Sequence, residues 1–444
     1  MSVVLKALDW REPLAVAAAF ADEPWAVLLL SSGAGAGRWS YFARRPAATA
    51  QVGREDGDGD FARLRAMLGP RRPTIAGAPP FQGGVIGLAA YEFADRLEPP
   101  RLPRDADWPD LVLARYDALL AFDHETGAIL ALGRGEDARA ANHAADEAAA
   151  WLDASKGYIA DPDPPAAACE ASSPGACYEA AVAGVKMRIA GGEIFQANIA
   201  RRWTGTLTPG AGPFAAFARL ARASPAPYCA WWRLPGLALV SHSPERFIAV
   251  ADGAVETSPI KGTRPRGANP AEDNALAREL LASEKDRAEN LMIVDLMRND
   301  LSRVCVPGSV KTPRLFDLTS YPAVHHLVST VTGRLEEGLD AADLLAAAFP
   351  PGSITGAPKI QAMKVIAALE PPRGPWCGTL FWAGLDGDFD SSVLIRTAAF
   401  VEEAGGWSFR FDAGAGIVAD SDPASERAET EVKALALRRA LTGP

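Results

Sequence analysis

The chain has 444 residues, of which 48% are hydrophobic and 23% charged, and its formal net charge is −10 at pH 7. This length is too great for one ordinary core, so we expect two domains or one large composite fold. The acidic balance, without a basic stripe, argues against nucleic acid as a partner, and no apolar run is long enough to span a membrane. A site for an anionic substrate must therefore make its own local positive field.

The five cysteines form no CxxC pair and are odd in number. This usage indicates free thiols in a reducing cytoplasm, rather than disulfides or zinc ligands. The first ten residues also lack the basic and then apolar pattern of a signal peptide, so we expect a cytoplasmic protein. The cysteines are Cys169, Cys177, Cys229, Cys305 and Cys377.

Residues 1–160 are predicted to form an N-terminal region. Residues 25–30 read as a buried strand, which leads into Ser31-Ser32-Gly33. The glycine-rich run 80–92 lacks the GxGxxG or GK[ST] spacing of a phosphate loop, so strand packing is the favoured role. Further strands are expected at 111–122 and 129–132, and a surface helix at 136–152.

A stretch rich in Pro, Ala and Ser, residues 161–174, predicts a linker to a second region, residues 175–440. That region opens with an amphipathic helix, 177–190. On the strand that follows, Gln196 and Asn198 would share one face. Such a pair could meet solvent or line a cleft.

The stretch 258–267, SPIKGTRPRG, is where we expect the active site. Pro259 and Pro265 suit neither a helix interior nor a central strand, and Gly262 permits a tight turn or close approach to a ligand. A solvated basic turn is the alternative, but the stretch lies between strand-like runs and other polar motifs follow it. We therefore predict an active-site loop centred on Lys261.

Two helices carry carboxylates at helical spacing. Either set could be a salt-bridged surface face. If the helices instead meet across a cleft, their acids would suit a hard cation such as Mg²⁺, held together with substrate oxygens. The residues concerned are Asp286 and Glu289 in helix 283–301, and Glu426, Glu429 and Lys433 in a final helix that starts at Asp422-Pro423.

The segment 392–401 is predicted as a buried strand that contains Arg396. A buried arginine is costly unless a carboxylate satisfies it, and an anionic ligand could supply that carboxylate as well as an Asp or Glu of the chain. The chain then returns through a hairpin to Ala413-Gly414-Ala415-Gly416, whose glycines could form an anion-binding nest of N–H groups.

Two further motifs carry polar groups. In the strand-like run 321–331, either His325 or His326 must face inward, where a satisfied core histidine is the commoner role. Residues 349–359 predict a tight turn into a helix, with Pro358 at the first helical position. The N–H groups and hydroxyls of that turn would suit an anion.

Together these motifs resemble those of the chorismate-utilising enzymes, a family that includes anthranilate, aminodeoxychorismate, isochorismate and salicylate synthases. The matching segments lie within residues 192–437 and are GEIFQANIARR, SPERF, PIKGTRPRG, SEKDRAENLMIVDLMRNDL, HHLVSTV, PPGSITGAPK, IRTA and AGAGIVADSDPASERAETEVKA. The N-terminal region matches more weakly, through LLSSG and PFQGGVIGLAAYE, and Ser32 lies where anthranilate synthases place a tryptophan-binding loop. The resemblance implies an α+β fold of two large antiparallel β-sheets packed as a sandwich, with outer helices and the site in a cleft.

Three positions indicate the branch of the family. Most members carry Ala where this chain has Lys261, and PIKGT looks like the aminodeoxychorismate synthases. Isochorismate synthases, which use water, place a lysine base at the position of Gln196, so the glutamine favours ammonia as the nucleophile. Trp376 stands where anthranilate synthases usually have tyrosine.

The resemblance also implies a mechanism. Neutral Lys261 would attack C2 of chorismate as the C4 hydroxyl leaves, with Glu245 as the general acid; ammonia would then enter at C4 and expel the lysine. The product would be 4-amino-4-deoxychorismate, which leads to 4-aminobenzoate and folate. The other implied roles are Arg396 and the Gly416 N–H on the enolpyruvyl carboxylate, Mg²⁺ between Glu289 and Glu429 on the ring carboxylate, His326 near the reacting ring, and Lys433, Thr263, Gly414, Gln196 and Trp376 as supporting contacts.

No cysteine has the GxCxG-like setting of a glutaminase nucleophile, so ammonia is expected from a separate glutamine amidotransferase subunit. The nearest alternative is anthranilate synthase component I, which aminates C2 and eliminates pyruvate. An idle regulatory or scaffolding subunit is a second alternative, and isochorismate formation is a third. Oligomeric state and any regulatory ligand of the N-terminal region stay open.

Overall fold

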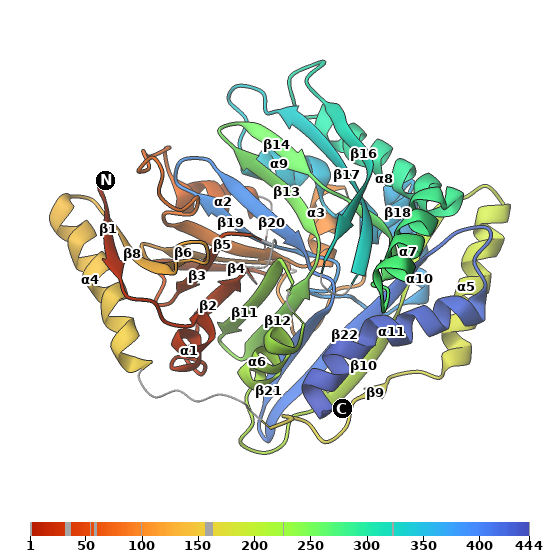
Figure 1. Ribbon diagram of the computed structural model, residues 1–444, viewed down its shortest axis with the longest axis horizontal. Coiled ribbons are helices and arrows are strands. Elements are labelled where there is room, and N and C mark those ends of the chain that lie inside the picture. The colour runs from red at the N-terminus through yellow and green to blue at the C-terminus, as the bar shows by residue number, and fades with distance from the viewer. Residues whose placement is uncertain are drawn as a thin grey trace.

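The computed structural model describes residues 2–31, 37–53, 55–56, 60–98, 100–155, 163–224, 226–321 and 324–443. These residues form an α+β fold with two large antiparallel sheets, and helices lie around the outside (Figure 1). Ser32 lies outside the described residues. Among the helices that are described, none is both long and apolar enough to cross a membrane.

The larger sheet has 12 strands within the described residues. In spatial order they are β1 (Ser2–Leu8), β8 (Ala128–Gly135), β7 (Ala118–Asp123), β3 (Trp39–Ala43), β2 (Val27–Leu30), β11 (Tyr228–Leu234), β12 (Leu237–Ser243), β21 (Thr397–Glu403), β22 (Gly406–Ile417), β10 (Gln196–Thr206) and β18 (Gly356–Ala357), with β9 (Glu170–Ala171) beside β10. Along β10 and β22 the register pairs Asn198 with Gly416 and Ala200 with Gly414.

The second sheet has 10 strands in the described part of the chain. Their order is β15 (Ile260–Pro265), β17 (Val324–Arg334), β14 (Ala254–Thr257), β13 (Arg246–Ala251), β20 (Phe389–Val393), β19 (Thr379–Gly384), β5 (Gly84–Ala89), β6 (Leu111–Tyr116) and β4 (Ala48–Val52), with β16 (Lys311–Ser320) beside β17. Residues 1–160 and 175–440 supply strands to both sheets, so the predicted linker does not separate one sheet from the other.

Five of the described helices, α4, α7, α8, α9 and α11, begin at a residue whose side chain caps the helix. Ser283 and Asp422 accept main-chain N–H groups at the start of α8 and α11, and Asp137 does so for α4. The helices are α1 (Pro13–Ala18), α2 (Asp60–Leu68), α3 (Ala94–Leu97), α4 (Ala138–Ala154), α5 (Gly175–Ala190), α6 (Pro213–Ala223), α7 (Pro270–Ala282), α8 (Glu284–Ser302), α9 (Ala341–Ala348), α10 (Lys359–Leu369) and α11 (Pro423–Thr442), with 3-10 turns η1 (Tyr91–Phe93) and η2 (Gly352–Ile354).

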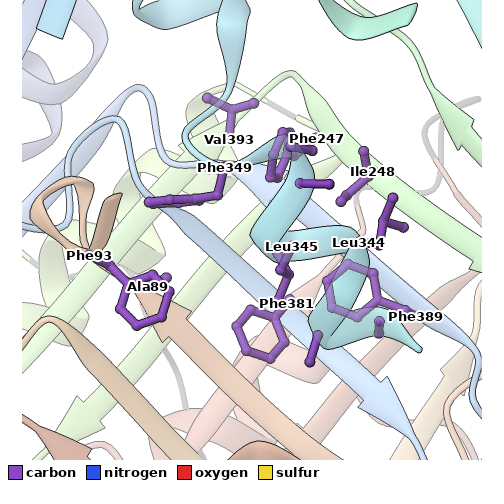
Figure 2. Packing of buried hydrophobic residues seen from close by; sticks show 14 of the residues in the cluster. Ala89, Phe93, Phe247, Ile248, Leu344, Leu345, Phe349, Phe381, Phe389 and Val393 are labelled. Atoms are coloured by element: carbon purple, nitrogen blue, oxygen red, sulfur yellow. The ribbon is translucent and has the colours of Figure 1, made fainter. Parts of the chain in front are cut away.

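One apolar core joins the N-terminal region to the rest of the chain. Phe93, from η1, and Phe247, from β13, both pack on Phe349 at the end of α9, with ring centroids 5.9 and 6.4 Å apart (Figure 2). Leu344 and Leu345 of α9 bury their side chains in the same cluster. Because burial of each such side chain is worth about 1.5–3 kcal/mol, this shared core holds the two regions together.

A second cluster fills the space between the sheets. It brings Ile86 and Leu88 of β5 into one core with Trp232 of β11 and Leu239 of β12. The sandwich predicted from the family resemblance is therefore confirmed. The glycine-rich run 80–92 contributes β5, as predicted, and Gly87 leaves room for the ring of Phe381 on the neighbouring strand.

The segment 392–401 is not one buried strand, contrary to the prediction. β20 ends at Val393 in the smaller sheet and β21 begins at Thr397 in the larger one, so the chain crosses between the sheets at residues 394–396. Arg396 sits at that crossing with φ 50°, a left-handed conformation that is uncommon for a side-chain-bearing residue. Hydropathy could not reveal the crossing because both strands are buried.

Three local predictions also need correction. The expected loop 258–267 contains β15, an irregular edge strand whose register shifts between Ile260 and Thr263, where Gly262 has φ +82°. The stretch 413–417 is regular strand within β22, not an N–H nest. Pro358 is the N-cap of α10, one residue before the first helical position.

Candidate active site

One cavity of about 1480 Å³ opens where the ends of both sheets meet α8 and α11. Its walls come from segments far apart in the sequence, including β10, β15, β17, β22 and the crossing at 395–396. Eleven of the twelve site residues predicted from the sequence line it. They are Lys261, Glu245, His326, Thr263, Arg396, Gly416, Gly414, Lys433, Trp376, Glu289 and Glu429.

Lys261 is half-buried on the irregular part of β15. Its Nζ donates a hydrogen bond to the main-chain oxygen of Ser353, at 2.8 Å. Burial lowers the pKa of the amine, although the carboxylates of Glu289 and Glu245 act in the opposite direction. Gly262 permits the bend of the strand because its φ of 82° suits glycine. A side chain would also fit poorly there, since a Cβ would lie 2.9 Å from Leu280 and 3.0 Å from Asp286.

Glu245 lies in the turn between β12 and β13 and is 5% exposed. Burial raises the pKa of its carboxyl, while a hydrogen bond with Ser353 and the charge of Lys261 oppose that shift. Burial thus pushes Lys261 and Glu245 toward their neutral forms, an amine and a carboxylic acid. A neutral amine can attack carbon and a protonated acid can donate to a leaving group.

Arg396 lines the cavity without an acidic partner. Over the described residues, its guanidinium forms no ion pair or hydrogen bond, and burial alone lowers its pKa. Half-buried Arg246, by contrast, binds Asp390 through two nitrogens. A cation held this way by a rigid crossing suits a carboxylate brought by a ligand.

His326 and Thr263 form a pair on neighbouring strands. Thr263 Oγ1 lies 2.9 Å from Nδ1 of His326, which is 4% exposed. Burial, together with the positive charge of Arg396, lowers the pKa of His326 to about 4. The imidazole is therefore neutral near pH 7. His325 is also buried, but its ring nitrogens contact Ser320 and Asp273 instead. Both histidines of the motif are therefore buried, not only one.

The two acidic helices meet across the cavity as predicted, with Asp286 and Glu289 from α8 and Glu426 and Glu429 from α11. Burial raises the pKa of Glu289, and the carboxylate of Glu426 adds to that shift. Burial also acts to raise the pKa of Glu429, but Lys433 Nζ, 2.7 Å from its Oε1, outweighs this, so the net shift is downward.

The carboxylates of α8 and α11 have the charge that a hard cation needs. Like charges face each other with incomplete compensation, which a divalent ion would relieve. No group of three or more His, Cys, Asp or Glu side chains among the described residues is arranged to hold a metal by itself. Glu289 and Glu429 would therefore be two protein ligands of an ion completed by substrate and water oxygens.

Gln196 is the predicted site residue that does not line the cavity. It is 0% exposed, and neither atom of its side-chain amide has a hydrogen-bond partner in the described structure. It lies directly behind Gly416, where a Cβ would approach Gln196 Nε2 to 2.4 Å. The glycine is thus required by close packing, and Asn198, rather than Gln196, reaches the cavity wall.

Lys433 and Trp376 support the strand that carries the glycines. Lys433 Nζ donates to the Gly414 oxygen at 2.8 Å, and a Cβ at Gly414 would lie 3.2 Å from Trp376 Cη2. Ser353 lines the cavity within the turn 349–359, whose hydroxyls were expected to suit an anion. Its contact with Lys261 was not expected, because a main-chain carbonyl, which every residue possesses, makes that contact.

Comparisons with known proteins agree on one family. The model of the chorismate binding enzymes matches residues 28–439. Aminodeoxychorismate synthase component 1 of Salmonella typhimurium is 42% identical over 79% of this chain and 75% of its own length. Anthranilate synthase component 1 of Streptomyces coelicolor is 38% identical, over 92% of this chain and 81% of its own.

A solved structure reproduces the fold. Anthranilate synthase component I from Streptococcus pneumoniae superposes with a TM-score of 0.80 and 28% identity, covering 91% of this chain and 92% of the other.

Proposed function

Because the chain belongs to the family of chorismate-binding enzymes, we propose that it replaces the 4-hydroxyl of chorismate with ammonia, giving 4-amino-4-deoxychorismate and water. Relatives named aminodeoxychorismate synthase component 1 support this reaction. The observation that carries it is Lys261, a half-buried amine whose pKa is lowered by its removal from solvent, in one cavity with Glu245 and Arg396.

The proposed reaction has two displacements. In the first, the amine of Lys261 forms a bond to C2 of the ring, both ring double bonds shift, and the C4 hydroxyl leaves as water with a proton from Glu245. In the second, ammonia bonds to C4, both double bonds shift back, and the lysine nitrogen departs from C2 as an amine with the proton that the bound ammonia releases, so the enolpyruvyl group is retained. The neutral forms of Lys261 and Glu245, which their burial favours, are the forms that these steps need.

Substrate recognition would use the charges on the walls. Chorismate has two carboxylates. The unpaired guanidinium of Arg396 would bind the enolpyruvyl carboxylate beside the Gly416 main chain. A Mg²⁺ ion between Glu289 and Glu429 would supply positive charge for the ring carboxylate. Neutral His326, held by Thr263, would face the reacting ring as a hydrogen-bonding group.

Ammonia would come from a separate glutamine amidotransferase subunit. None of the five cysteines, all in the described part of the chain, forms a disulfide, as predicted. Of these, Cys377 lines the cavity, but burial raises its pKa and keeps the thiol protonated, unlike a glutaminase nucleophile. The numbering of the relatives as component 1 agrees with a second component.

Product analysis tests the proposal. The purified chain, given chorismate, Mg²⁺ and ammonium, is expected to form 4-amino-4-deoxychorismate, identified by chromatography and mass spectrometry. The second candidate is anthranilate synthase activity, which the 38% identity to the Streptomyces coelicolor enzyme over 92% of this chain favours. Fluorescent anthranilate with released pyruvate would replace the proposal by that candidate. Absence of any turnover would favour a non-catalytic subunit.

A further inference from the structure

A buried guanidinium, that of Arg373, stands behind the cavity wall. Arg373 lies between α10 and β19 and is 2% exposed. It does not line the cavity itself. Its charge is balanced by Glu370, whose Oε2 accepts a hydrogen bond from Arg373 Nε at 2.9 Å. This ion pair with Glu370 is enough to balance the charge of Arg373, so its other contacts call for a separate explanation.

Three further contacts of the Arg373 side chain reach wall residues of the cavity. Its Nη2 donates to the main-chain oxygen of Asn198 at 2.7 Å, and its Nη1 to that of Ile354 at 3.3 Å. Its Cζ lies 4.8 Å from the ring centroid of Trp376. Asn198, Ile354 and Trp376 all line the cavity and come from separate segments of the chain. One rigid planar group thus sets the relative position of three walls.

The other face of the guanidinium is covered by the N-terminal region. Arg373 Cζ lies 4.6 Å from the ring centroid of Tyr91 in η1, so the cation is held between two aromatic rings. Next to it, Glu92 accepts the main-chain N–H groups of Arg373 and Gly374, at 2.6 and 3.0 Å. Of the two neighbouring residues of η1, Tyr91 therefore holds the side chain of Arg373 and Glu92 holds its main chain.

We infer that Arg373 is a positioning residue for the substrate cavity, and that Tyr91 acts on chorismate binding through it. The inference rests on the proposed function, because it concerns the walls that would bind chorismate. Trp376 also packs against Gly414 in the strand that would hold the enolpyruvyl carboxylate. A stack that shapes walls affects ground state and transition state alike, so its loss raises KM for chorismate and leaves kcat nearly unchanged.

Tyr91 offers a matched pair of variants. Its hydroxyl is buried without a hydrogen-bond partner in the described residues, so Tyr91→Phe keeps the stacked ring and loses no bond. Tyr91→Leu removes the ring face. We expect KM of Tyr91→Leu to rise about fivefold and that of Arg373→Lys about tenfold, since a desolvated cation–π contact is worth roughly a 2- to 30-fold change in equilibrium. Tyr91→Phe stays within about twofold of the wild type.

A double-mutant cycle separates positioning from general stability. In the Arg373→Lys background, Tyr91→Leu is expected to change KM by less than about twofold, because the group through which it acts has gone. Arg44 provides a control: it is buried, lies 4.0 Å from the Phe20 ring centroid and pairs with Glu23, and none of these residues lines the cavity. Arg44→Lys should lower the melting temperature without raising KM.

The outcomes are distinguishable. Wild-type protein that neither binds nor turns over chorismate would end the proposed function, and this inference with it. If the wild type is active, unchanged KM in folded Tyr91→Leu, an equal effect of Tyr91→Leu in both backgrounds, or an equal rise in Arg44→Lys would each overturn the inference alone. If Arg373→Lys does not fold, the KM values of Tyr91→Leu and Tyr91→Phe still test the inference. Equal KM values for these two variants would overturn it.

Discussion

The Nζ of Lys261 lies 2.8 Å from the main-chain oxygen of Ser353, and the two residues come from segments more than 90 positions apart. A carbonyl can accept a hydrogen bond from the amine in either protonation state, and it brings no negative charge that would hold the proton. Ser353 also forms a hydrogen bond to Glu245. The same residue therefore contacts the proposed nucleophile and the proposed acid, while burial lowers the pKa of Lys261 and raises that of Glu245, each toward the neutral form.

Replacing Lys261 tests the covalent step. Lys261→Ala is expected to lower kcat for 4-amino-4-deoxychorismate by at least about 10³-fold, because the nucleophile is lost. Without ammonium, intact-mass analysis of acid-quenched wild type should show an adduct of chorismate less one water, which the variant lacks. The control variant Lys364→Ala, at an exposed position on α10, should retain both the wild-type kcat and the adduct. The same adduct in Lys261→Ala would reject the role.

Arg396 should show opposite effects on stability and on substrate affinity. Arg396→Gln removes a half-buried cation with no acidic partner among the described residues, so the melting temperature should stay or rise. Its KM for chorismate should rise about 100-fold through loss of a charge-assisted carboxylate bond worth about 1.5–3 kcal/mol. Thermal unfolding and steady-state kinetics measure the two effects.

The matched control for Arg396 is Arg246, which pairs with Asp390. Arg246→Gln should destabilise the protein, because the buried Asp390 loses its partner, with little effect on KM. A large loss of stability in Arg396→Gln and none in Arg246→Gln would contradict the assignment of Arg396 as a ligand-binding cation.

The predicted site was recognisable because its chemistry lies in side chains within short motifs. Glu289 and Glu429 line one cavity from their helices, where helical spacing places each carboxylate, while Lys261 reaches the same cavity from the irregular part of β15. Arg396 lines the cavity, but the expectation of one strand around it was wrong, since hydropathy reads two consecutive buried strands as one. Gln196 was expected at the substrate and instead lies behind Gly416.

The contacts that the sequence did not show are those made by main-chain atoms or between distant segments. The contact of Ser353 with Lys261 is made by a main-chain carbonyl, and the Arg373 guanidinium contacts the rings of Tyr91 and Trp376, which lie far apart in the chain. The sharing of both sheets by residues 1–160 and 175–440 was also not visible. Strand order depends on pairing between remote segments, which local periodicity does not encode.

His326 should make stability depend on pH below neutrality. Its pKa is about 4 in the folded protein, against about 6.5 when unfolded, so between these values the unfolded chain binds more protons. Its contribution is therefore fully present above pH 6.5 and is lost as pH falls toward 4, by up to about 3 kcal/mol. Denaturant unfolding of wild type and His326→Gln between pH 4 and 7 should show a shallower slope in the variant. Parallel curves would contradict the buried, neutral state.

The last prediction concerns the acids of α8 and α11. If Glu289 and Glu429 hold Mg²⁺, replacing either with glutamine should raise the Mg²⁺ concentration needed for half-maximal turnover by at least about tenfold, since each removes an anionic ligand. Direct titration calorimetry with Mg²⁺ and chorismate checks binding independently of turnover.

A control for these acids lies on the same helix. Glu284 stands in the first turn of α8, is exposed and does not line the cavity, so Glu284→Gln removes the same charge without a proposed ligand. Its Mg²⁺ requirement should match the wild type. Without metal, the raised pKa of Glu289 reflects burial beside Glu426, so glutamine there should not destabilise the metal-free protein. If Glu284→Gln and Glu289→Gln raise the required Mg²⁺ concentration equally, the effect is one of long-range charge, and Glu289 is not a ligand of the ion.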